Sequence, residues 1–170
     1  MDLLTKQKPD LILLDMMMEP MDGWETLMAI HSDPASRHIP VIIITGKQPV
    51  PEEILQYGGM IEDFIVKPIE FHQIVPSLPR IIENNRNLGL LTAQKKEDGG
   101  DPACIDEYPR VLRLVRVTRH LMKRFRDIPW AERISLQKQE ERLRWLHNRL
   151  GFPDCILECE EGQGSSVQGS

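Results

Sequence analysis

The stretch "LILLDMMMEPMDGW", residues 11–24, places a single acid at the end of a continuous apolar run. Residues 11–14 are all branched and apolar, and Asp15 follows them directly. A run of this kind predicts a strand that is covered on both faces, as in a parallel sheet. A carboxylate at the end of a buried strand is costly unless it is paired or takes part in a reaction. Asp15 is therefore the first candidate for a functional residue.

Two more apolar runs, residues 41–44 and 64–66, predict further strands, with helical patterns at residues 23–31 and 52–57 between them. Strands that alternate with helices at this spacing are typical of successive βαβ units and an α/β fold.

The predicted strands end in a carboxylate, a hydroxyl and an ammonium, on Asp15, Thr45 and Lys67. Because the carboxyl ends of parallel strands open onto a common crevice, we expect these three side chains to share one site. Together they suit a site that carries a phosphoryl group, with Asp15 as nucleophile, Lys67 neutralising phosphate charge and Thr45 hydrogen-bonding a phosphate oxygen.

These residues resemble the receiver domain of two-component response regulators. The spacings of thirty residues from Asp15 to Thr45 and twenty-two from Thr45 to Lys67 are similar to those of the family's phosphoacceptor, switch hydroxyl and lysine. "MDG" at residues 21–23 matches the turn after the phosphoacceptor, and Lys67-Pro68 resembles the family's Lys-Pro pair, whose bond is usually cis. Phe64 falls at the position of the aromatic switch residue, and Gly46 at that of a small one.

The resemblance implies that a histidine kinase or a phosphotransfer protein phosphorylates Asp15 in a phosphorelay. Thr45 then moves toward the phosphate, Phe64 turns inward, and the face formed by the family's fourth helix, fifth strand and fifth helix changes its partner preference. Mg²⁺ is the implied cofactor, with Asp15 and the Met17 backbone carbonyl among its ligands. The alternative is a protein-interaction module whose degenerate receiver acts without phosphorylation.

The resemblance covers the chain only in part. We expect a partial flavodoxin-like receiver at residues 1–88, a doubly wound parallel sheet that lacks its first strands, and we expect a kink or break at Pro76 and Pro79. The acidic pair that holds Mg²⁺ belongs to the first strand of receivers and has no counterpart here, which favours a fragment or a start placed too far downstream. Loss of periodicity predicts a linker at residues 89–104.

Residues 105–150 predict a basic antiparallel helical hairpin that begins near Pro109, and we expect its Trp130 and Trp145 to pack against protein rather than stack on nucleic-acid bases. The segment holds 12 Lys/Arg against 6 Asp/Glu, a net charge of +6. Three interpretations of its arginines stay open: a solvated face on a self-packing or homodimerising hairpin, docking onto the acidic receiver or a kinase, and nucleic-acid contact. The first is favoured, and because no helix-turn-helix pattern stands out, nucleic-acid binding is not expected.

The remaining features favour a cytoplasmic protein without enzyme activity of its own. Residues 151–170 predict a disordered acidic and polar tail. The longest apolar runs are too short to cross a bilayer, the N-terminus lacks the apolar core of a signal peptide, and three cysteines argue against a disulfide framework. Cys155 and Cys159 lack a second ligand pair for a metal, and His72 and His120 lack the partners of a catalytic triad.

Overall fold

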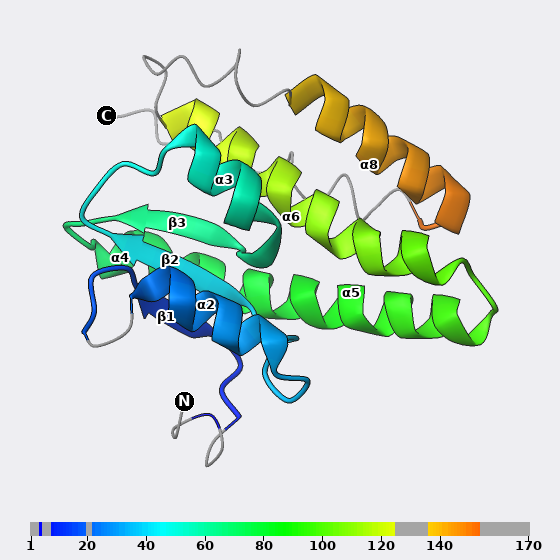
Figure 1. The fold of residues 1–170 in the computed structure, drawn as a ribbon, viewed down its shortest axis with the longest axis horizontal. Helices are drawn as coiled ribbons and strands as arrows, with labels where there is room; N and C mark the ends of the chain where they lie inside the picture. Colours follow the sequence, from blue (N-terminus) through cyan, green and yellow to red (C-terminus); the bar gives the residue numbers. More distant parts are fainter. Residues whose placement is uncertain (1–3, 5–7, 20–21, 125–135, 154–170) are drawn as a thin grey trace, which may run out of the picture.

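The computed structural model describes residues 4, 8–19, 22–124 and 136–153. Figure 1 shows a small sheet with helices on both faces and a pair of longer helices beside it. The elements are, in chain order, β1 (Ile12–Asp15), α2 (Gly23–Ser32), β2 (Val41–Thr45), α3 (Pro51–Tyr57), the 3₁₀ turn η1 (Gly58–Met60), β3 (Asp63–Val66), α4 (Phe71–Ile74), the 3₁₀ turn η2 (Val75–Ser77), α5 (Leu78–Glu97), α6 (Pro102–Arg124) and α8 (Leu136–Leu150).

The sheet is parallel and has the order β1-β2-β3 in the described part of the chain. Ile12 pairs with Val41 and Asp15 with Ile44, so the strands lie in register from the start of β1 to its end. Every residue of β2 is buried, because helices cover both of its faces. The predicted βαβ units are confirmed, and each strand boundary lies within one residue of the prediction.

Helix α2 has a well-defined start directly after the β1 end. The Asp22 side chain accepts a hydrogen bond from the Glu25 backbone N–H at 2.8 Å, and the Glu25 side chain accepts one from the Asp22 backbone N–H at 3.4 Å. This capping box satisfies donors that the first helical turn leaves without partners. Leu27 and Ile30 bury the inner side of α2 against the sheet. The helix predicted over residues 23–31 is confirmed, and it carries its own start signal.

The proline-rich segment after β3 is broken, as predicted. Helix α4 ends at Ile74, a 3₁₀ turn that contains Pro76 follows, and α5 begins anew with Pro79 near its N-terminus. Proline is tolerated in a first helical turn because the N–H that it lacks has no partner there. Ile74, Leu78 and Ile81 then pack under Ile42 and Ile65 on the second face of the sheet.

The predicted linker at residues 89–104 is wrong for most of its length. Helix α5 runs on to Glu97, and α6 already begins at Pro102. The charged and glycine-rich residues that suggested a linker form the end of a helix: Gly99 has φ +77°, and the Gly100 N–H donates to the Lys95 carbonyl at 2.9 Å. Leu88, at 5% exposure, gains its burial from α6 and α8, which local periodicity does not reveal.

Helices α6 and α8 form the predicted antiparallel hairpin, hereafter the hairpin. Tyr108 near the start of α6 hydrogen-bonds His147 near the end of α8. Arg119 near the end of α6 hydrogen-bonds Glu140 near the start of α8, so the two helices are antiparallel. The predicted start is wrong: α6 begins at Pro102, and Pro109 lies inside it. Three leucines of α8 are buried in the hairpin core, namely Leu143, Leu146 and Leu150.

Trp145 packs against a neighbouring arginine and stays half exposed. Its side chain is 50% exposed, and the Arg142 guanidinium lies 4.5 Å from the ring centroid. The leucines already fill the inner side of α8, so the indole lies on the other side and is covered only by a neighbouring cation. Trp130, Cys155, Cys159 and residues 154–170 of the predicted tail lie outside the described residues. The predicted disorder is wrong for Phe152, which is buried in the core of α6 and α8. None of the described helices is both long and apolar enough to cross a membrane.

The hairpin packs on the sheet domain through α6. Val117 and Leu121 belong to the same core cluster as Leu14, Ile43 and Phe64. In Figure 1, α6 lies between α5 and α8 and passes the β3 edge of the sheet. The interpretation of the arginines as a solvated face is therefore wrong for Arg113 and Arg116, whose side chains are 14% and 17% exposed.

Candidate functional site

Two of the predicted site residues are in direct contact at the carboxyl edge of the sheet. Asp15 ends β1 and Lys67 follows β3, and the Lys67 Nζ lies 2.5 Å from the Asp15 Oδ2. The second carboxylate oxygen accepts a hydrogen bond from the Met17 backbone N–H at 3.0 Å. Fifty-two positions separate the two side chains in sequence. Their contact follows from the parallel order of the strands.

This arrangement keeps the Asp15 carboxylate ionised. The hydrogen bond from Lys67 and the Met17 N–H lower its pKa below the usual value of 3.8. The Asp15 side chain is 34% exposed, so both a nucleophilic oxygen and its counter-ion are accessible. An ionised and accessible carboxylate beside an ammonium has the electrostatics of a phosphoryl acceptor.

The loop after Asp15 requires glycine at position 23. A Cβ on Gly23 would lie 2.7 Å from the Met16 Cα and 2.9 Å from the Asp15 carbonyl oxygen. The Gly23 N–H also donates to the Met16 carbonyl at 3.3 Å. The start of α2 therefore packs directly on the backbone that carries Asp15, and the "MDG" motif has a steric reason for its last residue.

Thr45 and Gly46 form the adjacent strand end. The Thr45 hydroxyl donates to the Lys47 carbonyl and accepts from the Lys47 N–H, both at 3.1 Å. This local ring holds the hydroxyl beside its own loop. No atom lies within 4 Å of a Cβ built on Gly46, so the space next to Thr45 is open.

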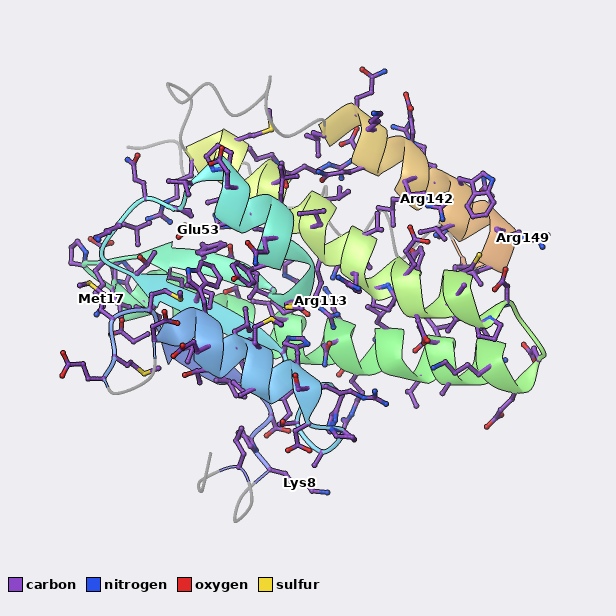
Figure 2. All side chains as sticks on the ribbon, viewed as in Figure 1. Lys8, Met17, Glu53, Arg113, Arg142 and Arg149 are labelled. Atoms are coloured by element: carbon purple, nitrogen blue, oxygen red, sulfur yellow. The ribbon has the colours of Figure 1, made fainter. Side chains whose placement is uncertain are left out.

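A cavity of about 230 Å³ is lined by Met16, the residue after Asp15, and by three of the predicted residues, Met17, Thr45 and Phe64, but not by Asp15 or Lys67. Its other lining residues include Trp24, Lys47 and Glu53. Figure 2 shows Met17 at the loop after β1 and Glu53 on α3, on the two sides of this end of the sheet. The structure thus brings Thr45 and Phe64 to one cavity, and Asp15 and Lys67 into one ion pair outside its lining.

Phe64 already points inward. Its side chain is 1% exposed and packs in the core cluster with Val117 and Leu121 of α6. The Trp24 ring lies edge-on to it, with centroids 6.2 Å apart. The Lys67-Pro68 peptide bond is cis, in agreement with the resemblance.

Two residues of the cavity wall, Trp24 and Glu53, and the neighbouring Tyr57 were not identified as a unit from sequence. The Trp24 indole N–H donates to Glu53 at 3.3 Å. The Trp24 ring stacks on the Tyr57 ring, with centroids 4.2 Å apart. Glu53 also accepts a hydrogen bond from the Val50 N–H at the start of α3. Trp24 lies on α2, whereas Glu53 and Tyr57 lie on α3, and no sequence pattern links residues of the two helices.

The described residues do not offer a complete magnesium site. No group of three or more His, Cys, Asp or Glu side chains in this part of the chain is placed to hold a metal ion. Asp15 supplies carboxylate oxygens and Met17 a backbone carbonyl, whereas Mg²⁺ takes six ligands in near-octahedral geometry. The described residues therefore supply only part of the ligand set that magnesium needs.

The chain is similar in sequence to several known proteins. DivK, a polar-differentiation response regulator of Brucella anthropi, is 38% identical over 84 residues, which cover 49% of this chain and 62% of DivK. A probable cyclic di-GMP phosphodiesterase of Vibrio cholerae is 31% identical over 94 residues, which cover 55% of this chain. The response regulator PleD of Caulobacter vibrioides is 39% identical over 66 residues, which cover 39% of this chain.

The chain spans only part of these relatives, 21% of the phosphodiesterase and 14% of PleD. Among solved structures, the N-terminal domain of a response regulator receiver protein from Methanoculleus marisnigri is similar, with 52% identity, coverage of 46% of this chain and 64% of that chain, and a TM-score of 0.39. Residues 1–78 match the family of response regulator receiver domains, and this part of the chain is hereafter the receiver segment.

Proposed function

We propose that the chain accepts a phosphoryl group on Asp15 from a histidine kinase or a phosphotransfer protein, in a cytoplasmic phosphorelay. The observation that carries this proposal is the Lys67–Asp15 ion pair of 2.5 Å between the ends of β1 and β3. The match of residues 1–78 to receiver domains supports the same assignment.

The transfer needs one nucleophile and one leaving group. An Asp15 carboxylate oxygen attacks the phosphorus of a phosphohistidine, an acyl phosphate bond forms, and the P–N bond breaks. The phosphohistidine reacts in the form protonated on its other ring nitrogen, so the bonding pair of the P–N bond stays on the leaving nitrogen and the histidine departs as neutral imidazole. The low pKa of Asp15 ensures that the attacking oxygen is ionised at neutral pH.

Lys67 and Thr45 have separate parts in this proposal. The Lys67 ammonium moves from the carboxylate to a phosphoryl oxygen and offsets the new negative charge. Thr45 exchanges its hydrogen bond with Lys47 for one to a second phosphoryl oxygen, into the open space beside Gly46. Both movements replace one hydrogen-bond partner by another, so neither leaves a buried group unsatisfied.

Acetyl phosphate and intact-mass spectrometry test the proposal. Wild-type protein incubated with acetyl phosphate and Mg²⁺ gains one phosphoryl group, which hydroxylamine removes because it cleaves acyl phosphates. Asp15→Asn abolishes the adduct, whereas the control Asp10→Asn retains it, since Asp10 is exposed and precedes β1. An adduct on Asp15→Asn, or none on wild type, would contradict the proposal.

A second candidate is an interaction module that works without phosphorylation. The packing of α6 on the β3 edge favours an interaction module. This edge binds α6 while Asp15 is paired with Lys67, that is, without a phosphoryl group on Asp15. On this account Asp15→Asn leaves partner binding unchanged. A change in partner affinity of the same variant supports the phosphoacceptor instead.

A further inference from the structure

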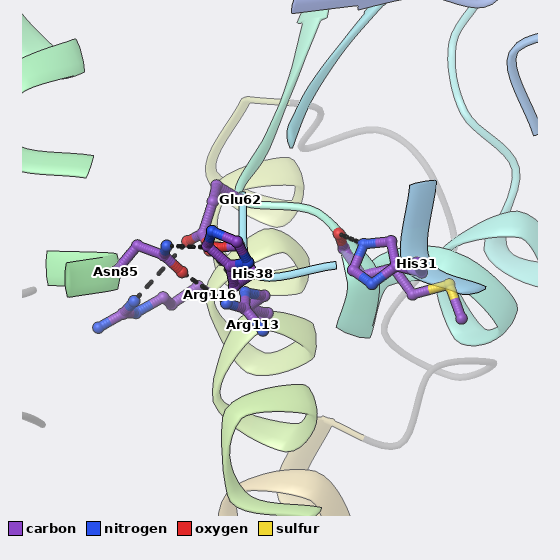
Figure 3. A network of polar contacts seen from close by, with 7 residues as sticks. His31, His38, Glu62, Asn85, Arg113 and Arg116 are labelled. Carbon is purple, nitrogen blue, oxygen red and sulfur yellow. Dashed lines mark hydrogen bonds and ion pairs between the residues drawn. The ribbon is translucent and has the colours of Figure 1, made fainter. Parts of the chain in front are cut away.

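The arginines of the hairpin differ in what they contact. On α6, Arg113 donates hydrogen bonds to Glu62 at 2.5 Å and to Asn85 at 2.7 Å, and Figure 3 shows these side chains meeting inside the molecule. The cations of α8 lie elsewhere, because α8 is the helix farthest from the sheet (Figure 1). The surface of α8 therefore has basic side chains that the fold does not use at the sheet.

Four exposed residues of α8 form one stripe along the helix, hereafter the α8 stripe: Lys138, Arg142, Trp145 and Arg149. At 3.6 residues per turn they fall within roughly 60° of the helix circumference and extend over about 17 Å. The leucines that fill the hairpin core lie on another side of α8 (Leu143, Leu146, Leu150). The stripe is thus a separate, outward-facing surface that combines three cations with one large aromatic ring.

The indole of Trp145 is held in place although it is half exposed. The Arg142 guanidinium lies 4.5 Å from the ring centroid, and the same guanidinium donates to the Glu107 carboxylate of α6 at 2.8 and 2.6 Å. Figure 2 shows Arg142 and Arg149 on α8. Because the guanidinium covers one face of the ring, the exposed area of Trp145 lies on the other face and the edges. The ring offers a restrained, flat apolar surface to solvent.

The free positive charge of the stripe lies on the two sides of this ring. Glu107 already neutralises Arg142. In the part of the chain that the structure describes, neither Lys138 nor Arg149 is in an ion pair, although Arg149 interacts electrostatically with Asp101 just before α6. Lys138 lies about 10 Å along the axis before Trp145, and Arg149 about 6 Å after it. Two cations therefore flank one aromatic platform.

A ligand that fits this surface carries anionic groups at intervals and a flat ring between them. Single-stranded nucleic acid has this chemistry, since its phosphates bind cations and its unpaired bases stack on aromatic side chains. A duplex presents the phosphates but hides the faces of its bases. A membrane surface requires several apolar side chains, and the stripe has only one. A second copy of the stripe, packed antiparallel, would bring Lys138 against Arg149 and be repelled.

We propose that the α8 stripe binds single-stranded nucleic acid, with one base stacked on Trp145 and backbone phosphates bound by Lys138 and Arg149. DNA and RNA bind alike, because the ring and the cations contact parts that both polymers share. A helix-turn-helix reads a duplex, so its absence from the sequence does not bear on a single strand. Binding at the stripe requires no phosphoryl group on Asp15.

Fluorescence anisotropy of a labelled short oligothymidylate tests the stacking contact in the full chain at low salt. Wild type binds, and Trp145→Ala weakens binding about fivefold or more, the lower end of the loss expected for one stacked base. Trp145→Phe retains most of the affinity, since a phenyl ring also stacks. No binding to wild type, or equal affinity of the alanine variant, would overturn the proposal.

The salt dependence of the same binding tests the phosphate contacts. In Arg149→Gln, the slope of log K against log salt concentration falls by about 0.7, the value for one phosphate contact on a single strand. The matched control is Arg144→Gln, which removes the same charge from an exposed position of α8 outside the stripe and leaves the slope unchanged. Equal effects of the two variants would mean a diffuse attraction of polyanions and would overturn the assignment to the stripe.

Competition distinguishes the nucleic acid from an acidic protein partner. Oligouridylate displaces the labelled oligothymidylate as well as unlabelled oligothymidylate does, whereas a duplex of the same length and polyglutamate of the same charge displace it several-fold less well, since neither presents a base face to Trp145. Displacement by polyglutamate with equal efficiency would overturn the proposal in favour of an acidic polypeptide. Circular dichroism of each variant verifies that its helices are retained.

Discussion

At the scale of single residues, the chemistry depends on a carboxylate held between an ammonium and a backbone N–H. Both contacts stabilise the ionised form of Asp15, so its pKa is lower in the folded protein than in the unfolded chain. The resulting stabilisation is present above the unfolded value of 3.8 and is lost as the pH falls through the folded pKa.

Replacement of Lys67 tests this account of the charge. In Lys67→Met, the pKa of Asp15 rises toward its usual value, since the largest cause of the lowering is gone. A carbon-13 NMR titration of the Asp15 carboxyl measures the change directly. An unchanged titration curve would mean that the backbone contacts alone set the pKa.

Two glycine-to-alanine substitutions are expected to change the free energy of unfolding in opposite directions. Gly23→Ala forces a Cβ against the Met16 and Asp15 backbone, and we expect a loss of about 1–3 kcal/mol in the free energy of unfolding, typical of overpacked sites. Gly89→Ala meets no atom within 4 Å inside α5, and we expect a gain of about 0.5–1 kcal/mol. Urea unfolding of both variants checks the pair, and a stable Gly23→Ala would contradict the close approach.

At the scale of elements, helix α6 is bound to β3 by a contact that depends on pH. The hydrogen bond with Asp63 raises the pKa of His120 above 6.5, while burial and the nearby Lys123 and Arg124 oppose it. A raised pKa means that the contribution is fully present below pH 6.5 and is lost as the pH rises through the folded value.

His120→Gln removes this pH dependence. We expect wild type to lose part of its stability between pH 6.5 and the folded pKa, and the variant to show a flatter profile over the same range. The magnitude is modest, because the His120 side chain is 41% exposed and solvent screens the pair. Thermal unfolding at a series of pH values provides the measurement, and parallel profiles would rule out a role for this pair.

The elements also show which features the sequence could predict. Strands β1, β2 and β3 were predicted because each is a continuous apolar run, and the spacing of Asp15, Thr45 and Lys67 predicted a common edge. The end of α5 could not be predicted, because the residues "EDGG" at positions 97–100 are equally common after a helix end and at the start of a linker. Only the burial of Leu88 against α6 and α8 decides between the two.

At the scale of the whole molecule, the receiver segment and the hairpin share one core. Among the interpretations of the basic helix, docking onto the acidic receiver agrees with the structure for Arg113 and Arg116. The charge asymmetry that favours such docking is visible in the sequence. The acids that bind α6 could not be predicted, because no sequence pattern connects Glu62 and Asp63 with residues of α6. The possible homodimer through the hairpin stays a prediction.

The most direct test of the account asks whether residue 15 carries the phosphoryl group. Borohydride reduces an aspartyl phosphate to homoserine, so protein treated with acetyl phosphate and then with borohydride records the modified position permanently. Tandem mass spectrometry of the peptide over residues 9–37 is predicted to find homoserine at position 15 in wild type and none in Asp15→Asn. Homoserine at another acid, or at no position, would contradict the assignment of Asp15 as the phosphoacceptor.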